Sequence, residues 1–150
     1  MMHRLVALTV FAALLFSPML ASAAELVGEG QTPGSKIVVS SVKRDAGGTV
    51  TLRFQLVNDG EEAVKIYGVF GEYFYLDKVT LLDGVNKKKY LVVKSADGYC
   101  ICSELKADVV KGSRFNLWAK FPAPPDDVKK ITVIVPGFEP VEVPITAAAP

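Results

Sequence analysis

The cysteines Cys100 and Cys102 carry the clearest chemistry in this sequence, because they are its only two thiols and stand one residue apart. On an extended strand, residues i and i+2 face the same side at about 6.6 Å, near the upper Cα–Cα limit for a disulfide. A bridge would therefore need a bent backbone. The spacing leaves open a local structural disulfide, free or intermolecularly paired thiols, a redox-sensitive pair, and a two-thiolate Cu(I) site.

The N-terminal segment predicts export from the cytoplasm. Residues 1–4 are short and basic, residues 5–20 are almost wholly apolar, and residues 21–23 are small, as a signal peptidase requires. The apolar run is shorter than a membrane-spanning helix needs. We therefore expect residues 1–23 to be a cleaved secretory signal peptide and the mature chain to be periplasmic or secreted, without stable membrane insertion.

Removal of this signal peptide would also remove His3, the sole histidine of the chain. A chain without histidine cannot build a Ser-His-Asp or Cys-His nucleophile or a His-ligated metal site. Loss of Arg4 would lower Lys plus Arg from 17 to 16, equal to the 16 Asp plus Glu, whereas nucleic-acid binders usually carry a basic excess. The preferred interpretation is a protein that is not an enzyme and has no cofactor, no metal and no nucleic-acid partner.

The rest of the sequence consists of short alternating segments separated by turn residues, which is typical of β-strands. The clearest is residues 49–58, where Val, Leu and Phe alternate with Thr, Arg and Gln. About seven or eight such strands without an amphipathic helix predict an all-β sandwich or barrel. The predicted strands are residues 36–42, 49–58, 63–70, 73–83, 89–96, 113–122, 129–135 and 141–145.

The mature sequence has the length of one domain. Residues 24–35 are rich in glycine and small polar residues and are expected to form a flexible lead-in. The β-sandwich is expected over residues 36–146. Residues 147–150 are expected to be a frayed tail.

Four segments in this order carry a resemblance to a known group: "VSSVKRDAGGTVTLRFQLVNDGEEAV", "KVTLLDGVNKKKYLVVKSADGYCICS", "RFNLWAKFPAPPDDVKKITVIVPG" and "PVEVPI". Their order resembles that of small exported bacterial immunoglobulin-like domains, which stand alone or precede another cell-envelope module such as an OmpA-type peptidoglycan-binding domain. The resemblance implies an immunoglobulin-like antiparallel β-sandwich. It implies no catalytic residues.

The aromatic stretch "IYGVFGEYFYL" at residues 66–76 is the best candidate for a binding surface. One face of a strand cannot bury all of its rings, and aromatic side chains with a polar tip are enriched at interfaces. A competing interpretation places Phe70 and Phe74 in the core and leaves the tyrosines covering a sheet edge. Trp118, on a later strand, is either core or an exposed contact. The predicted binding residues are Tyr67, Phe70, Tyr73, Tyr75 and Trp118.

These features together predict a non-catalytic binding or accessory module of the bacterial cell envelope. A rigid β-sandwich would present an edge strand or the aromatic surface to a partner, which we expect to be an envelope protein. The alternative from a different class is a thiol protein that uses Cys100 and Cys102 for redox exchange or Cu(I) binding. The state of the two thiols distinguishes these hypotheses.

Overall fold

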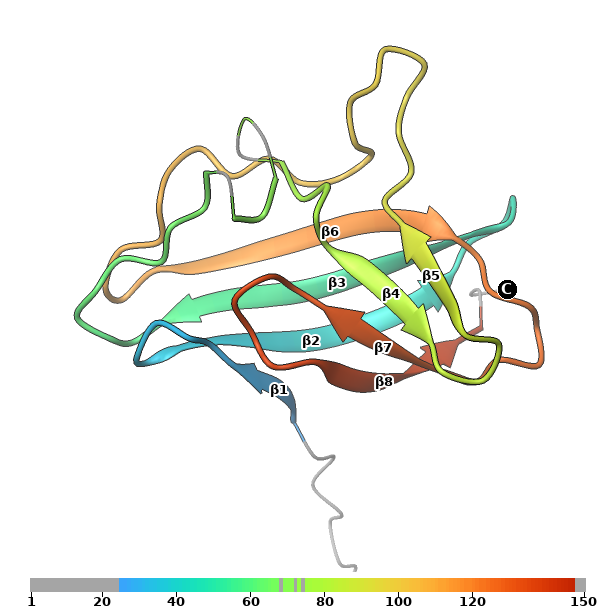
Figure 1. Cartoon of the computed structure of the whole chain (residues 1–150), viewed down its shortest axis with the longest axis horizontal. Helices are drawn as coiled ribbons and strands as arrows, with labels where there is room; N and C mark the ends of the chain where they lie inside the picture. Colours follow the sequence, from blue (N-terminus) through green and yellow to red (C-terminus); the bar gives the residue numbers. More distant parts are fainter. Residues whose placement is uncertain (1–24, 68, 72, 74, 148–150) are drawn as a thin grey trace, which may run out of the picture.

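The computed structural model describes residues 25–147 apart from 68, 72 and 74, and places them in eight β-strands and no helix (Figure 1). The all-β class predicted from the sequence is confirmed. The expected signal peptide at residues 1–23 and residues 148–150 of the expected tail lie outside the described residues. The strands are β1 (Leu26–Glu29), β2 (Ser35–Arg44), β3 (Thr49–Asn58), β4 (Thr80–Asp83), β5 (Lys88–Leu91), β6 (Arg114–Pro122), β7 (Lys130–Ile134) and β8 (Val141–Thr146).

The strands form one curled sheet in the order β5-β4-β7-β8-β2-β3-β6, with β1 paired to β2. Neighbouring strands are antiparallel except β8 and β2, which are parallel where Val42 faces Ile145 and Lys43 faces Thr146. Figure 1 shows β4, β5 and β7 lying across β2, β3 and β6. The sheet therefore folds over on itself.

The hydrophobic core lies between the two halves of the folded sheet, because alternate side chains of each strand point inward. In β3, Val50, Leu52, Phe54 and Leu56 are buried while Arg53 is exposed, as the alternating sequence predicts. The same cluster of buried side chains includes residues of β4, β6, β7 and β8. One core therefore serves both halves.

The two ends of the strand order, β5 and β6, meet at a backbone junction formed by Val93, Ile101 and Lys120. The Val93 N–H donates to the Lys120 carbonyl at 2.8 Å, the Ile101 N–H donates to the Val93 carbonyl at 2.7 Å, and the Lys120 N–H donates to the Ile101 carbonyl at 3.0 Å. We call this junction the seam. It joins the segment after β5 and the cysteine segment to the outer edge of β6.

The prediction of a strand over residues 63–70 is wrong, because the chain turns at Ile66. The backbone N–H groups of Val69 and Phe70 both donate to the Ile66 carbonyl at 3.1 Å. This turn ends any extended run of aromatic residues, so the segment forms turns and isolated bridges instead of a strand.

The strand predicted over residues 73–83 is confirmed only at its end, where β4 forms. Tyr73 has a φ of 53°, a left-handed conformation that no strand contains. Similarly, the strand predicted over residues 89–96 ends at Leu91, after which the chain enters a hairpin closed by the backbone bridge between Lys94 and Cys100.

The flexible lead-in predicted over residues 24–35 is replaced by a strand and a turn. Within this segment β1 pairs along its whole length with β2. A side chain at Gly28 would collide with the Glu139 carbonyl and with Val141, so glycine here reflects close packing. The glycine content that suggested a linker is explained by this close approach of β1 to the rest of the sheet.

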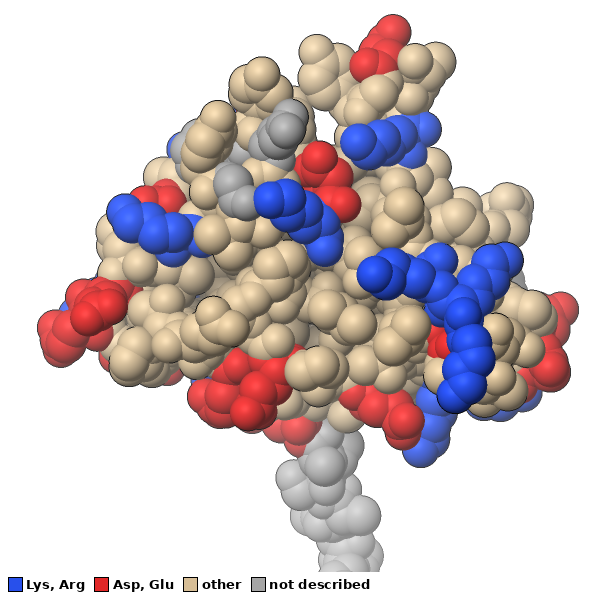
Figure 2. Space-filling model, in the orientation of Figure 1, with Lys and Arg blue, Asp and Glu red and all other residues tan. Residues whose placement is uncertain are grey.

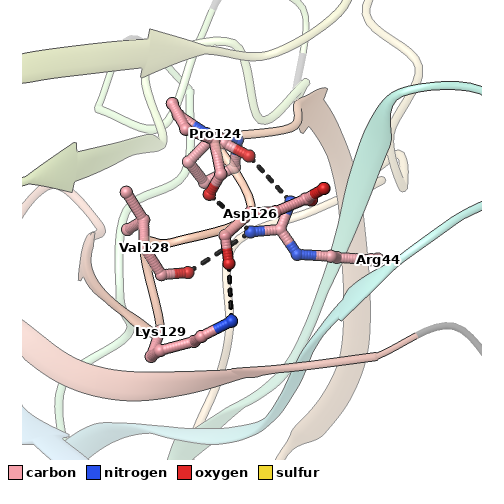
Figure 3. A network of polar contacts seen from close by, with 6 residues as sticks. Arg44, Pro124, Asp126, Val128 and Lys129 are labelled. Atoms are coloured by element: carbon pink, nitrogen blue, oxygen red, sulfur yellow. Dashed lines mark hydrogen bonds and ion pairs between the residues drawn. The ribbon is translucent and has the colours of Figure 1, made fainter.

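Arg44, at the end of β2, anchors the proline-rich connection between β6 and β7 (Figure 3). Its guanidinium donates to the carbonyls of Pro124 at 2.7 Å, Pro125 at 2.8 Å and Val128 at 3.3 Å. It also forms an ion pair with Asp126 at 3.3 Å. Because both terminal nitrogens of the guanidinium hold this connection, the arginine has a structural role.

Candidate functional site

Three tyrosines surround a shallow recess of about 220 Å³ between the chain before β4 and the hairpin after β5. We call it the tyrosine recess. Cys100 lies at its edge, so the cysteine pair and part of the predicted aromatic surface come together in one place. The side chains that give the recess its character are Tyr73, Tyr75, Tyr99, Asp77, Asp97 and Lys94.

The tyrosines project because turns hold them. Tyr73 is 69% exposed, and its left-handed backbone is rare for a residue with a bulky side chain. Tyr99 is 59% exposed and ends a tight turn in which the Ser95 N–H donates to the Tyr99 carbonyl at 2.8 Å. Gly98 provides the positive φ of 86° that this turn needs. The rings of Tyr75 and Tyr99 then meet edge to face.

The charges around the recess are unbalanced, because two carboxylates face one ammonium group. The Lys94 Nζ lies 4.0 Å from the Asp77 Oδ2, at the limit of an ion pair. Asp97 is exposed at the hairpin turn and forms no ion pair within the described part of the chain. Figure 2 shows acidic and basic side chains distributed together over the face that it displays.

Cys100 and Cys102 lie with their Cα atoms 5.4 Å apart and their sulfur atoms in bonding contact. The backbone is bent relative to an extended strand, as the spacing requires. Both side chains pack against the core. The backbone of Cys100 forms an isolated β-bridge with Lys94, and that of Cys102 forms one with Ala119 of β6. The pair therefore encloses Ile101, the central residue of the seam.

The other predicted binding residues lie elsewhere. Phe70 is fully buried and its ring lies 6.0 Å from that of Phe138, so its assignment to a binding surface is wrong. Its packing against a distant aromatic ring was invisible in the local pattern. Tyr67 is exposed but does not line the recess. Trp118 is half-buried and lines a separate depression with Arg53. Phe74 lies outside the described residues.

The sequence analysis missed four residues of the recess: Asp77, Lys94, Asp97 and Tyr99. A local signal existed for the last two, because Asp97-Gly98 predicts a turn that would display the following tyrosine. Asp77 and Lys94 had no such signal, since only the folded sheet brings their segments together.

Other carboxylates of the structure are used as hydrogen-bond acceptors. Asp45 accepts from Thr49 at 3.2 Å, Thr51 at 2.6 Å and Lys120 at 2.7 Å. Burial raises the pKa of Asp45, but these hydrogen bonds outweigh it and leave the pKa below its ordinary value. The three partners lie on β3 and β6, so Asp45 ties the β2–β3 turn to the sheet.

Within the described residues, no three His, Cys, Asp or Glu side chains gather where they could hold a metal ion. Nor does this part of the chain contain a helix long and apolar enough to span a membrane. No protein-family model, curated protein or solved structure matches the chain.

Proposed function

We propose that this protein is an exported, non-catalytic binding or accessory module of the bacterial cell envelope that holds a protein partner at the tyrosine recess. The observation that carries the proposal is the convergence of Tyr73, Tyr75 and Tyr99 from two separate segments onto one recess. Tyrosine is enriched at protein interfaces because it offers a large apolar surface with a polar tip at little entropic cost.

Export to the periplasm or medium and an immunoglobulin-like sandwich belong to the same proposal. The signal-peptide pattern of residues 1–23 supports export. The curled all-β sheet with one core supports a sandwich-like scaffold. On such a scaffold, loops at one end of the sheet are the usual binding elements.

Aromatic anchoring is favoured over addition of a strand to the outer edge of β6. The outer edge of β6 already receives backbone partners, since the Ser103 N–H donates to the Trp118 carbonyl at 2.8 Å. The seam occupies the next position along the same edge. An extended peptide would have to displace these bonds, whereas the recess is open to a partner without any rearrangement.

Asp83 and Asp108 are acidic side chains that the structure uses as hydrogen-bond acceptors. Asp83 accepts from the Asn86 side chain at 2.7 Å and from two backbone N–H groups. The hydrogen bond from Asn86 lowers the pKa of Asp83, against the opposing effect of burial. The hydrogen bond from Lys65 likewise lowers the pKa of Asp108. Carboxylates held ionised in turns are poor general acids.

The proposal is tested by photo-crosslinking in cells that express the chain. A photoreactive amino acid at Tyr99 or Tyr73 is expected to give the same discrete protein adduct. Val85 is the control position, because it is 79% exposed at the opposite end of the β4–β5 hairpin from the recess. Equal crosslinking from Val85, or no discrete adduct from the recess, would contradict the proposed function.

The thiol hypothesis gains one observation, the bonding contact of Cys100 and Cys102 at the recess edge. It is separated from the binding hypothesis by the double variant Cys100→Ser, Cys102→Ser. If the crosslinked adduct forms in this variant as in the wild type, the pair is structural. If the adduct disappears while the fold remains, thiol chemistry becomes the preferred function.

A further inference from the structure

We propose that the tyrosine recess receives a cationic side chain of the protein partner, and arginine in preference to lysine. This inference rests on the proposed function and names the chemistry that the partner must present. It follows from the aromatic surfaces, the charge imbalance and the size of the recess.

The aromatic surfaces favour a cation. The face of a tyrosine ring is electron-rich and attracts a cation within about 6 Å of the ring centroid. Tyr75 and Tyr99 meet at an interplanar angle of 62°, which forms a corner with more than one aromatic surface. The chain already contains this interaction elsewhere, because the Lys88 Nζ lies 5.1 Å from the centre of the Tyr90 ring.

The charges also favour a cation. Asp77 and Asp97 together outnumber the single ammonium group of Lys94. Lys94 does not neutralise the site, since its side chain is 52% exposed and its Nζ lies as far as 4.0 Å from the Asp77 Oδ2, at the limit of an ion pair. Asp97 remains available for an incoming donor. An anionic ligand would be repelled by both carboxylates, and a neutral apolar ligand would leave the charge imbalance in place.

The size of the recess favours one side chain. Its volume is about 220 Å³, below the range of about 300–1,000 Å³ that is typical of pockets for drug-sized ligands. Arginine suits the corner better than lysine, because a planar guanidinium can stack on a ring while its edge donates to a carboxylate. The depression beside Trp118 is less suited to a cationic side chain, since its lining includes Arg53 and no carboxylate.

The test is an NMR titration of the full chain, recovered from cells with its cysteines unreduced, against short capped peptides. The peptides are identical except for a central arginine, lysine, citrulline or glutamate. Citrulline keeps the shape of arginine but removes its charge. We expect amide shifts at residues 73–77 and 94–100, and binding of the citrulline peptide about three-fold to tenfold weaker than that of the arginine peptide.

Two variants complete the test. Asp97→Asn, which removes charge at an exposed turn, is expected to lower the affinity for the arginine peptide by about three-fold or more. Tyr67→Ala, which removes an exposed tyrosine outside the recess, is the matched control and should leave binding unchanged. Equal binding of citrulline or glutamate, shifts that map elsewhere, or no binding of the arginine peptide would overturn the inference.

The crosslinking experiment distinguishes failure of this inference from failure of the proposed function. If the Tyr99 position gives its adduct equally well in the Asp97→Asn background and the peptides show no charge preference, the binding module stands and the cationic preference falls. If the arginine peptide binds selectively but no adduct forms in cells, the recess chemistry stands and the proposed function falls.

Discussion

The rings of Tyr75 and Tyr99 meet edge to face with 6.0 Å between their centroids. One ring belongs to the irregular chain before β4 and the other to the hairpin after β5. The contact therefore joins two loops that flank one pair of strands. Since both loops line the tyrosine recess, this aromatic pair sets the shape of the candidate site.

Replacing Tyr99 by alanine should affect binding far more than stability. Tyr99 is largely exposed, so its loss should cost about 0.5–1.5 kcal/mol, the value of one aromatic pair. Urea unfolding measures this cost, and crosslinking from the Tyr73 position measures partner binding. Tyr67→Ala, outside the recess, is the control and should leave partner binding unchanged. A stability loss of several kcal/mol would mean that Tyr99 is structural.

Replacing Tyr90 by phenylalanine should leave the protein as stable or make it more stable. The Tyr90 hydroxyl is buried and has no hydrogen-bond partner among the described residues. Removing an unsatisfied hydroxyl recovers part of a desolvation penalty of about 1–3 kcal/mol. Urea unfolding at neutral pH measures the change, with Tyr73→Phe, at an exposed tyrosine, as the control. A clear loss of stability would show that the hydroxyl has a partner.

The same side chain predicts a loss of stability in alkali. Burial raises the pKa of Tyr90, and Asp83 adds to this effect while Arg44 opposes it. Above the ordinary tyrosine pKa of about 10, the unfolded chain ionises at this position while the folded chain does not. The unfolded state is therefore favoured as pH rises. Tyr90→Phe should lose less stability than the wild type in alkaline urea titrations.

Asp45 predicts the opposite dependence in acid. Its pKa is below the ordinary value, because hydrogen bonds from Lys120, Thr51 and Thr49 outweigh the effect of burial. The folded state therefore gains stability above the ordinary pKa of about 3.9 and loses it as pH falls further. Thermal unfolding at a series of acidic pH values should show a shallower loss for Asp45→Asn than for wild type. Exposed Asp127→Asn should follow the wild type.

The double variant Cys100→Ser, Cys102→Ser should fold with a small loss of stability. Cross-linking residues so close in sequence removes little entropy from the unfolded chain, about 1.5 kcal/mol by the loop-closure relation. Circular dichroism and urea unfolding report the fold and its stability. Failure to fold would show that the pair is required to hold Ile101 at the seam, and the structural role would then exceed loop closure.

Replacing Arg44 by lysine should destabilise the protein although the charge is kept. A lysine cannot donate to three carbonyls in the planar geometry seen here, so we expect a loss of about 1.5–3 kcal/mol in urea unfolding. Arg53→Lys, on the exposed face of β3, is the control and should be nearly neutral. Equal effects of both variants would contradict the anchoring role.

The sequence predicts strands where apolar residues alternate, as with Val50, Leu52, Phe54 and Leu56 of β3, because these side chains meet the core. Prediction from the sequence fails where contacts between distant segments determine the local structure or the burial of a residue. The glycines near β1 look like those of a linker, but Gly28 is needed because the Glu139 carbonyl approaches it closely. Phe70 looks like part of an exposed aromatic run, but the turn at Ile66 directs it into the core.

In the candidate site too, some residues were predictable from the local sequence and others depended on tertiary contacts. Cys100, Tyr73 and Tyr75 were identified as residue types that could act, and the structure places them around one recess. Their meeting with Tyr99 depends on how β4 and β5 fold across β6, which no local pattern encodes. The two acids and the lysine of the recess became visible only in three dimensions.

The parallel pairing of β8 with β2 has a consequence for the order of events in biosynthesis. The strand that links the two halves of the sheet is the last one in the chain, since Val42 meets Ile145. Contacts between residues so far apart in sequence form slowly, and here Ile145 must be present before the two halves can join. Loss of β8 would therefore leave the two halves of the sheet unjoined, because β8 stands between β7 and β2 in the strand order.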